Sequence, residues 1–308
     1  MRRAVAGALL AAGAIMAAAV PARAYVRYMT SENMPFYWAN PCVGVIAYPA
    51  GLAGMMPADQ VMNAASAAGD AWSAGQNDTA LVIQVASTTG PSPGAKYDGQ
   101  NSLIFDETSW CSANDTSPCD YDPAALAITT VLARGSGAIV DADIEVNAKN
   151  FTWADVDLLP SSGHGMDVQD LQNALTHEMG HLIGLDHPCY LAGATTQARA
   201  TDNLGNPVPE CADAPPAVME STMYPSAVPG DTSKRTLAAD DQLAVTQIYP
   251  SSLATSIPPM CAKPTPLANR DSGCAVAGDD RGAGAALTFV VAAMMVAARR
   301  RGQRAAPA

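Results

Sequence analysis

The stretch from residue 177 to residue 187 reads His-Glu-Met-Gly-His-Leu-Ile-Gly-Leu-Asp-His and holds three of the four histidines in the chain. Side chains four residues apart lie on one face of an α-helix, so His177 and His181 can bind the same metal ion. Gly184 stands where the helix must end, because glycine adopts the left-handed conformation without steric cost, and His187 then returns as a third ligand. Three nitrogen ligands with one open position are typical of a catalytic zinc site, whereas structural zinc sites are closed by four protein ligands.

Glu178 follows the first histidine and lies on the flank of the same helix face. A carboxylate there can act as a general base toward a water on the metal. The alternative is a polar helix with clustered histidines. A chance match to the whole motif in a chain this poor in histidine is about one in 10⁵. The sequence therefore predicts one zinc ion held by His177, His181 and His187, with Glu178 as the catalytic residue.

This motif resembles that of the metzincin metallopeptidases, and two further segments support the resemblance. Residues 221–225 read Ser-Thr-Met-Tyr-Pro, which is similar to the Met-turn beneath the zinc of that group, with Met223 as its methionine. Residues 236–250 are similar to the last helix of the matrixins, a metzincin family, and include the acidic pair Asp240 and Asp241.

The resemblance covers residues 25–250 and implies an α+β metzincin zinc-peptidase fold. Such a fold has a twisted mixed five-stranded sheet, an active-site helix, the Met-turn and a C-terminal helix. The strand near residues 125–132 would form the edge of the cleft, where an extended peptide could add as a further strand. Asp240 would pair with an N-terminal ammonium freed at Tyr25, and Asp241 would bond to the Met-turn backbone.

Hydrophobic patterning predicts the remaining elements. One helix is expected at 57–74, where apolar residues recur at helical spacing and Pro57 suits the first turn. Asp167 is expected to cap the active-site helix. Short apolar runs predict five strands, at 42–48, 81–86, 102–105, 125–132 and 138–146.

One of these strands alternates strictly between polar and apolar residues. Residues 141–147 place Asp141, Asp143, Glu145 and Asn147 on one face. Carboxylate and amide oxygens suit calcium, so this face is a candidate calcium site. The alternative is the solvated outer face of a strand.

Both ends of the chain carry segments outside the domain. Residues 1–24 are typical of a signal peptide, with two arginines, an apolar run and a small-residue cleavage site after Ala24; a retained anchor is the alternative. Residues 251–273 are rich in Pro, Ser and Thr, which favours an extended stalk.

Residues 274–308 form a C-terminal tail in which Gly-Cys precedes an uncharged run at 282–298 and a cluster of arginines. The tail resembles the MYXO-CTERM sorting signals of myxobacterial surface proteins, which implies processing at Cys274 and a place at the cell surface. Its partners would be the membrane and a sorting protease. The alternative is a plain transmembrane anchor, for which the run is near the short limit of length.

Charge and cysteine content agree with export. The formal net charge of −12 argues against nucleic acid or an anionic membrane surface as a partner. Seven cysteines are an odd number, and a sorting role for one leaves six to pair. The expected disulfides are Cys111–Cys119, Cys189–Cys211 and Cys42–Cys261.

These observations favour a monomeric, secreted or surface-anchored zinc endopeptidase that hydrolyses polypeptides with Glu178 as general base. Two other functions stay open. The first is a catalytically silent binding or adhesion module on the same fold, against which the intact Glu178 argues, because metal binding alone needs only the histidines. The second is a zinc hydrolase of a non-peptide substrate.

Overall fold

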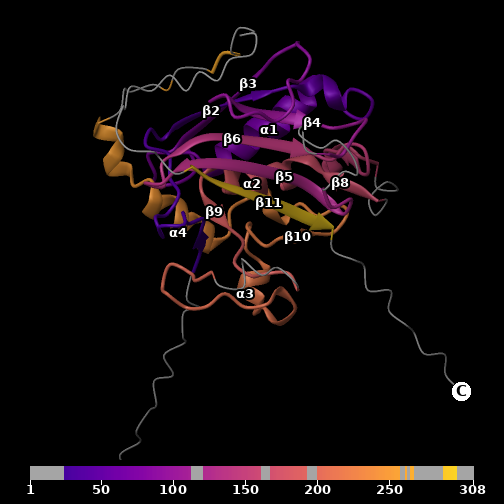
Figure 1. Cartoon of the computed structure of the whole chain (residues 1–308). Coiled ribbons are helices and arrows are strands. Elements are labelled where there is room, and N and C mark those ends of the chain that lie inside the picture. The colour runs from indigo at the N-terminus through magenta and orange to yellow at the C-terminus, as the bar shows by residue number, and fades with distance from the viewer. Residues whose placement is uncertain are drawn as a thin grey trace, which may run out of the picture.

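The computed structural model in Figure 1 describes residues 24–111, 121–160, 167–192, 200–256, 261, 264–266 and 287–296. Most of the expected signal peptide, most of the stalk and residues Cys119 and Cys274 lie outside these ranges. Predictions that concern those segments therefore stay predictions.

Five strands form the sheet that the sequence predicts. The antiparallel pair among these five is a hairpin whose turn contains Gly137 at a φ of 85°, and a Cβ there would meet the carbonyl oxygen of Pro35. The other strands run parallel to one another. An α+β fold with a mixed five-stranded sheet is thus confirmed. In spatial order the strands are β5 (Ala125–Arg134), β6 (Ile139–Val146), β4 (Asn101–Phe105), β2 (Cys42–Ala47) and β3 (Val82–Ser87).

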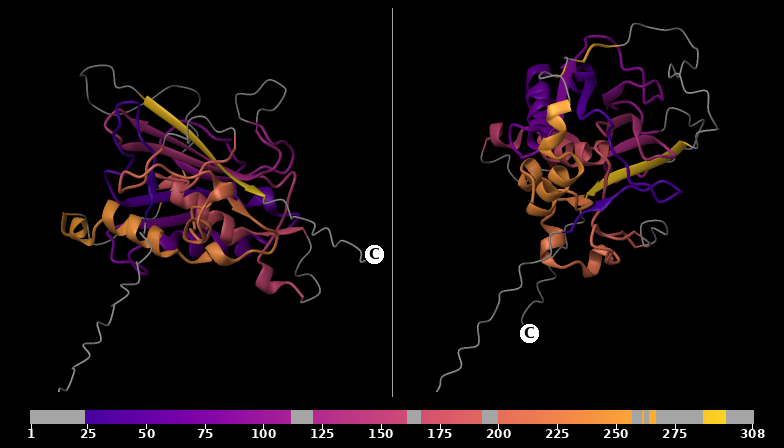
Figure 2. Two further views of the ribbon diagram at one scale, coloured as in Figure 1. Left: turned by 90° about the horizontal axis from the view of Figure 1, so that it is seen from below. Right: turned by 90° about the vertical axis from the view of Figure 1, so that its left-hand side faces the viewer.

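Two helices lie side by side against the sheet (Figure 2). α1 (Ala58–Trp72) lies between β2 and β3 in the chain, as the crossover of a parallel pair requires. α2 (Leu171–Leu182) packs against α1, β5 and β6. The buried Trp72 joins the two helices, because its Nε1–H donates to the carbonyl of Thr176 at 2.8 Å.

Outside these layers the molecule consists of short elements and irregular chain (Figure 1). β1 pairs antiparallel with β9, and β7 pairs parallel with β8. The strands here are β1 (Val26–Arg27), β7 (Thr152–Ala154), β8 (Val168–Asp170), β9 (Leu185–Asp186) and β10 (Ser226–Ala227). The helices are α3 (Pro216–Met219) and α4 (Ala239–Ile248), and the 3₁₀ turns are η1 (Pro49–Leu52), η2 (Val156–Leu158), η4 (Cys211–Asp213), η5 (Ser233–Arg235) and η6 (Ser251–Ser256).

The polar face of β6 is buried, so the expectation of a solvated strand face is wrong. Asp143 accepts hydrogen bonds from the backbone N–H groups of Lys96 and Ser102 at 2.7 and 2.8 Å. Asp141 accepts from Gly99, and Glu145 accepts from the hydroxyl of Tyr121. The carboxylates thus anchor the long loop before β4, and the segment that carries Tyr121, to the sheet.

Residues 287–296 of the apolar run form a strand, where the alternative of a transmembrane anchor expects a helix. β11 (Leu287–Val296) pairs antiparallel with β5 and parallel with β10. An outer strand offers unpaired backbone groups, and β-branched residues such as Val290 and Val291 favour pairing there. Within the described ranges, no helix is long and apolar enough to cross a membrane.

Two of the three expected disulfides are present, Cys42–Cys261 and Cys189–Cys211. Cys111 is also disulfide-bonded, and its expected partner Cys119 lies outside the described residues. Disulfides persist in oxidising compartments, so these bonds agree with export.

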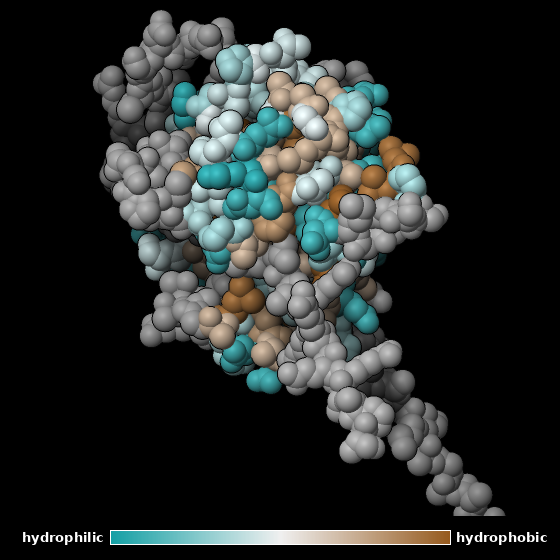
Figure 3. All heavy atoms as spheres, turned by 90° about the vertical axis from the view of Figure 1, so that its right-hand side faces the viewer, coloured by the Kyte–Doolittle hydropathy of each residue, from teal (hydrophilic) through white to brown (hydrophobic). Residues whose placement is uncertain are grey.

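The described surface is mixed in character. On the face shown in Figure 3, groups of hydrophobic residues are interspersed with hydrophilic ones. Large exposed apolar side chains such as Leu158 and Leu204 come from different segments of the chain. Scattered exposure of this kind is normal for a soluble domain.

Candidate metal centre

The helix that carries two of the three histidines is fixed at its start by an ionic cluster. Asp170, rather than the expected Asp167, is the N-cap of α2 and accepts from the backbone N–H of Asn173 at 2.8 Å. Arg235 binds both oxygens of Asp170 and also pairs with Asp155 at 2.7 Å. The start of α2 is therefore held to the η2 and η5 turns that surround it.

The three histidines meet in the interior, as the spacing predicts. His177 and His181 lie one turn apart on α2, which ends at Gly184 with a φ of 98°. The chain then returns through β9, and His187 follows it directly. The Nε2 atoms are 3.1 Å apart for His177 and His181, 3.2 Å for His177 and His187, and 3.0 Å for His181 and His187.

Backbone carbonyls hold two of the imidazoles in the form that binds a metal. Nδ1 of His177 lies 2.7 Å from the carbonyl oxygen of Thr222, and Nδ1 of His181 lies 2.8 Å from that of Leu185. A carbonyl oxygen only accepts, so Nδ1 carries the hydrogen and Nε2 carries a lone pair. Tyr28 adds a hydroxyl 2.9 Å from Nδ1 of His181.

Burial keeps all three imidazoles neutral. It lowers the pKa of His181 to about 3 and the pKa values of His177 and His187 well below the usual range. Neutral imidazole is the form that ligates metals.

The geometry of the three nitrogens fits one metal ion. Nitrogens held 2.0–2.1 Å from a tetrahedral zinc ion lie about 3.3 Å apart, close to the separations here. Lone pairs that face one another at this distance repel unless a cation lies between them. The group formed by His177, His181 and His187 could therefore hold a metal ion, and it is the one such group of His, Cys, Asp or Glu in the described part of the chain.

Glu178 lies beside this group with one carboxylate oxygen held and the other free. The hydroxyl of Thr129 on β5 donates to Oε2 at 2.5 Å, whereas Oε1 is buried without a hydrogen-bond partner. Burial raises the pKa of Glu178 to about 8, against the opposing effects of Thr129, Lys234 and the backbone N–H of Met294. An unpaired buried oxygen beside three metal-ligating nitrogens is where a water or a substrate atom would bind.

The expected Met-turn packs directly under the helix. Met223 is buried, and a Cβ added to Gly180 would lie 2.2 Å from its sulfur, so only glycine allows this close packing. The backbone N–H of Thr222 donates to Asp241 at 2.7 Å, as the resemblance implies. In the intact chain the backbone nitrogen of Tyr25 donates to the side chain of Asn203.

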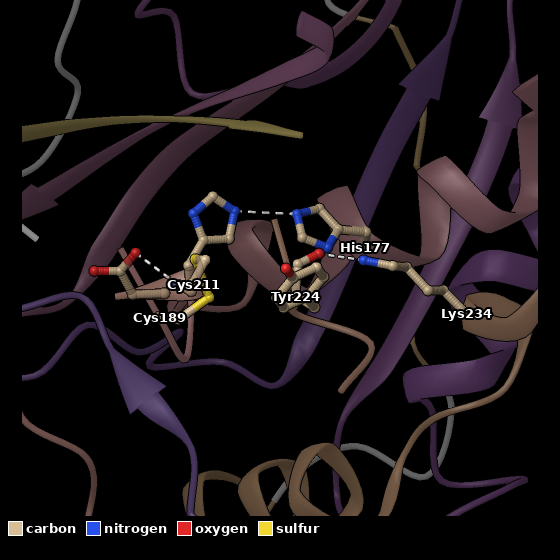
Figure 4. Close-up of a disulfide and its surroundings, with 7 residues drawn as sticks. His177, Cys189, Cys211, Tyr224 and Lys234 are labelled. Carbon is tan, nitrogen blue, oxygen red and sulfur yellow. Dashed lines mark hydrogen bonds between the residues drawn. A yellow bond between two sulfur atoms is a disulfide. The ribbon is translucent and has the colours of Figure 1, made fainter. Parts of the chain in front are cut away.

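A buried lysine lies on the other side of the turn. Lys234 is only 4% exposed, and its ammonium donates to the carbonyl of Tyr224 and lies over the ring of that residue. Burial lowers the pKa of Lys234 to about 7. In Figure 4, Lys234 and the Cys189–Cys211 disulfide stand on either side of Tyr224.

Comparison with known proteins adds no identification. No family model matches this chain, and no curated protein matches it either. The interpretation of the site therefore depends on its residues and geometry.

The structure brings together every predicted residue of the site that it describes: His177, His181, His187, Glu178 and Met223. Cys274 lies outside the described residues. Sequence reasoning missed Thr129 and Lys234, which approach the site from β5 and η5. The predicted role of residues 125–132 as the cleft edge could have pointed to Thr129, whereas no local pattern marks Lys234.

Proposed function

We propose that this chain is a zinc-dependent endopeptidase of the metzincin type. The observation that carries the proposal is the joint arrangement of His177, His181, His187 and Glu178. Three neutral imidazoles bring their Nε2 atoms within 3.2 Å of one another, and a buried carboxyl group beside them keeps one oxygen without a hydrogen-bond partner. A zinc ion bound by the three nitrogens supplies a Lewis acid for a carbonyl oxygen and lowers the pKa of water.

The chain's own groups would handle the proton. Thr129 holds Oε2 of Glu178, which leaves Oε1 to take a proton from the attacking water and later give it to the leaving nitrogen. Because Thr129 and Glu178 come from different elements, their hydrogen bond fixes the carboxylate relative to the strand at the cleft edge. A catalytic group held in the correct orientation raises the reaction rate more than one that is only close to the reacting atoms.

The outer edge of β5 supports a polypeptide as the substrate. An extended segment, β11, adds to it in antiparallel register. Backbone pairing of this kind recognises peptide chains of many sequences, whereas a small non-peptide substrate would not need it. This distinguishes the proposal from a hydrolase of another substrate class.

The surrounding fold also supports the proposal by resemblance. The mixed sheet, the helix that ends at Gly184 and the turn at Met223 follow the order expected of a metzincin domain over residues 25–250. We propose further that the enzyme is exported, with Cys274 as the sorting residue of the tail. The two described disulfides agree with an oxidising compartment.

The test is hydrolysis of an internally quenched peptide library by the purified chain, with and without residues 274–308. Zinc-loaded protein should cleave peptides, chelation should abolish cleavage, and added zinc should restore it. A protein that binds peptides without ever cleaving them would support the silent binding module instead. Cleavage that survives complete removal of metal would contradict the proposal.

A further inference from the structure

β11 lies beside the candidate metal centre. It lies between β5 and β10 in the sheet order β10-β11-β5-β6-β4-β2-β3, and it also packs against α2 (Figures 1 and 2). β5 carries Thr129, which bonds to Glu178, and β10 begins three residues after Met223. A segment between these two strands therefore passes directly over the site.

The pairing is continuous and places the segment in one register. Leu287 pairs with Arg134 at one end of β5 and Met295 with Ala125 at the other, with an irregularity between Met294 and Met295. At the centre, Ala292 pairs with Thr129.

Met294 inserts into the interior at this point. Its side chain is fully buried and belongs to the same hydrophobic cluster as Met223 and Leu175. Ala292 pairs with Thr129, whose hydroxyl bonds to Glu178, so the segment around Ala292 passes beside the candidate general base.

We propose that β11 is an intramolecular occupant of the substrate groove. Residues 287–296 bind as a peptide substrate would, with Ala292 opposite Thr129 and Met294 buried in the hydrophobic cluster that contains Met223, and they exclude other peptides while they stay there. The role of β11 as an inhibitor rests on the proposed peptidase function. The occupancy, which is the binding of β11 along β5, does not depend on that function.

The covalent link between β11 and the rest of the chain favours its binding over that of a free peptide. A segment covalently linked to its site can have an effective concentration in the millimolar range, so a free peptide of similar affinity competes poorly. Because Cys261 is disulfide-bonded to Cys42, a cut in the chain must lie between Cys261 and β11 to turn the segment into a dilute ligand. Processing on the C-terminal side of the domain would therefore open the groove.

Binding of a probe peptide tests the occupancy. The probe is a fluorescent synthetic peptide of residues 287–296 with flanking lysines, titrated against the full chain carrying Glu178→Ala so that no hydrolysis occurs. Met294→Pro removes the N–H and breaks the pairing, so it should tighten probe binding by at least ~10-fold. Ala305→Pro, a matched substitution outside β11, should change nothing. Equal affinities for the parent and Met294→Pro would overturn the proposal.

A crosslink tests the register without relying on Met294→Pro to fold. Thr130 and Val291 are directly paired, so cysteines at both positions should form a disulfide in the full chain. Cysteines at Thr130 and Met295, which are out of register, should not. The absence of the first crosslink, or formation of both in equal amounts, would contradict the placement of β11.

Hydrolysis of an unrelated peptide separates this inference from the proposed function. Cleavage by Met294→Pro at least ~10-fold faster than by the parent supports both. Equal cleavage by the two chains overturns the occupancy and leaves the peptidase. No cleavage by either, with the probe and crosslink results as expected, supports the occupancy and refutes the peptidase. A cut within residues 287–296 of the zinc-loaded chain, seen by intact mass, also supports the occupancy.

Discussion

The hydroxyl of Thr129 donates a hydrogen bond to Oε2 of Glu178 at 2.5 Å, and this bond joins strand β5 to the helix that carries two of the candidate metal ligands. Both residues are fully buried. The carboxylate is thus held by the strand along which an extended peptide would lie, so the two parts of the site cannot shift independently.

Thr129→Val should lower kcat/KM by about 10-fold or more, because the carboxylate loses its fixed orientation. The loss of a partner for a buried polar group should also cost ~1–3 kcal/mol of unfolding free energy. Thr129→Ser keeps the hydroxyl and should retain most of the activity. Peptide hydrolysis and urea unfolding measure the two effects. Wild-type kinetics in Thr129→Val would show that Glu178 needs no support from β5.

Gly180→Ala should destabilise the protein by ~1–3 kcal/mol, because the new methyl group would overlap Met223 and Trp72. Gly75→Ala is the matched control, since a Cβ there meets nothing within 4 Å. Chemical denaturation of both variants measures the difference. If Gly180→Ala were as stable as the control, the close packing of the helix on Met223 would be wrong.

The buried carboxylates of β6 should make stability depend on pH. Burial raises the pKa of Asp143 to about 8, above its value in an unfolded chain. A raised folded-state pKa contributes stability that is fully present in acid and is lost as the pH rises through 8. The unfolding free energy should therefore fall between about pH 4 and pH 8, the span between the usual and the raised pKa of Asp143.

Asp143→Asn removes this titration and should flatten the pH dependence. It should also be less stable than the parent in acid, because an amide has one oxygen to accept from Lys96 and Ser102 where the carboxyl group has two. Urea unfolding at several pH values measures both effects. Parallel curves for the two proteins would contradict the assignment. Stabilisation of the parent, but not the variant, by calcium at high pH would show that this face binds a cation after all.

The parts of the molecule that could be predicted from sequence depend on short-range geometry. His177 and His181 share a helix face because they are four residues apart, wherever the helix lies in the fold. Gly184 ends the helix because glycine readily adopts the left-handed backbone conformation. The link between Cys189 and Cys211 followed from their places on either side of one loop. These features need no knowledge of distant contacts.

The parts that could not be predicted depend on contacts between distant segments. Alternation along β6 showed that Asp141 and Asp143 share a face, but the loop that buries them lies some forty residues earlier in the chain. The apolar run around Val290 has a composition that suits either a membrane helix or a strand. It forms a strand here by pairing with β5, a contact that the sequence of the run does not reveal. The burial of Lys234 likewise follows from the turn around Tyr224.

Zinc content measured together with hydrolysis, in Glu178→Ala and His181→Ala, tests the proposed centre most directly. Both variants are made in the Met294→Pro chain so that the groove is open. Glu178→Ala should keep one zinc per chain and lose at least ~10²-fold in kcat, the low end for loss of a general base. His181→Ala should lose metal and activity together, because two nitrogens hold zinc poorly. Full zinc content in His181→Ala, or wild-type turnover in Glu178→Ala, would contradict the assignment of these residues.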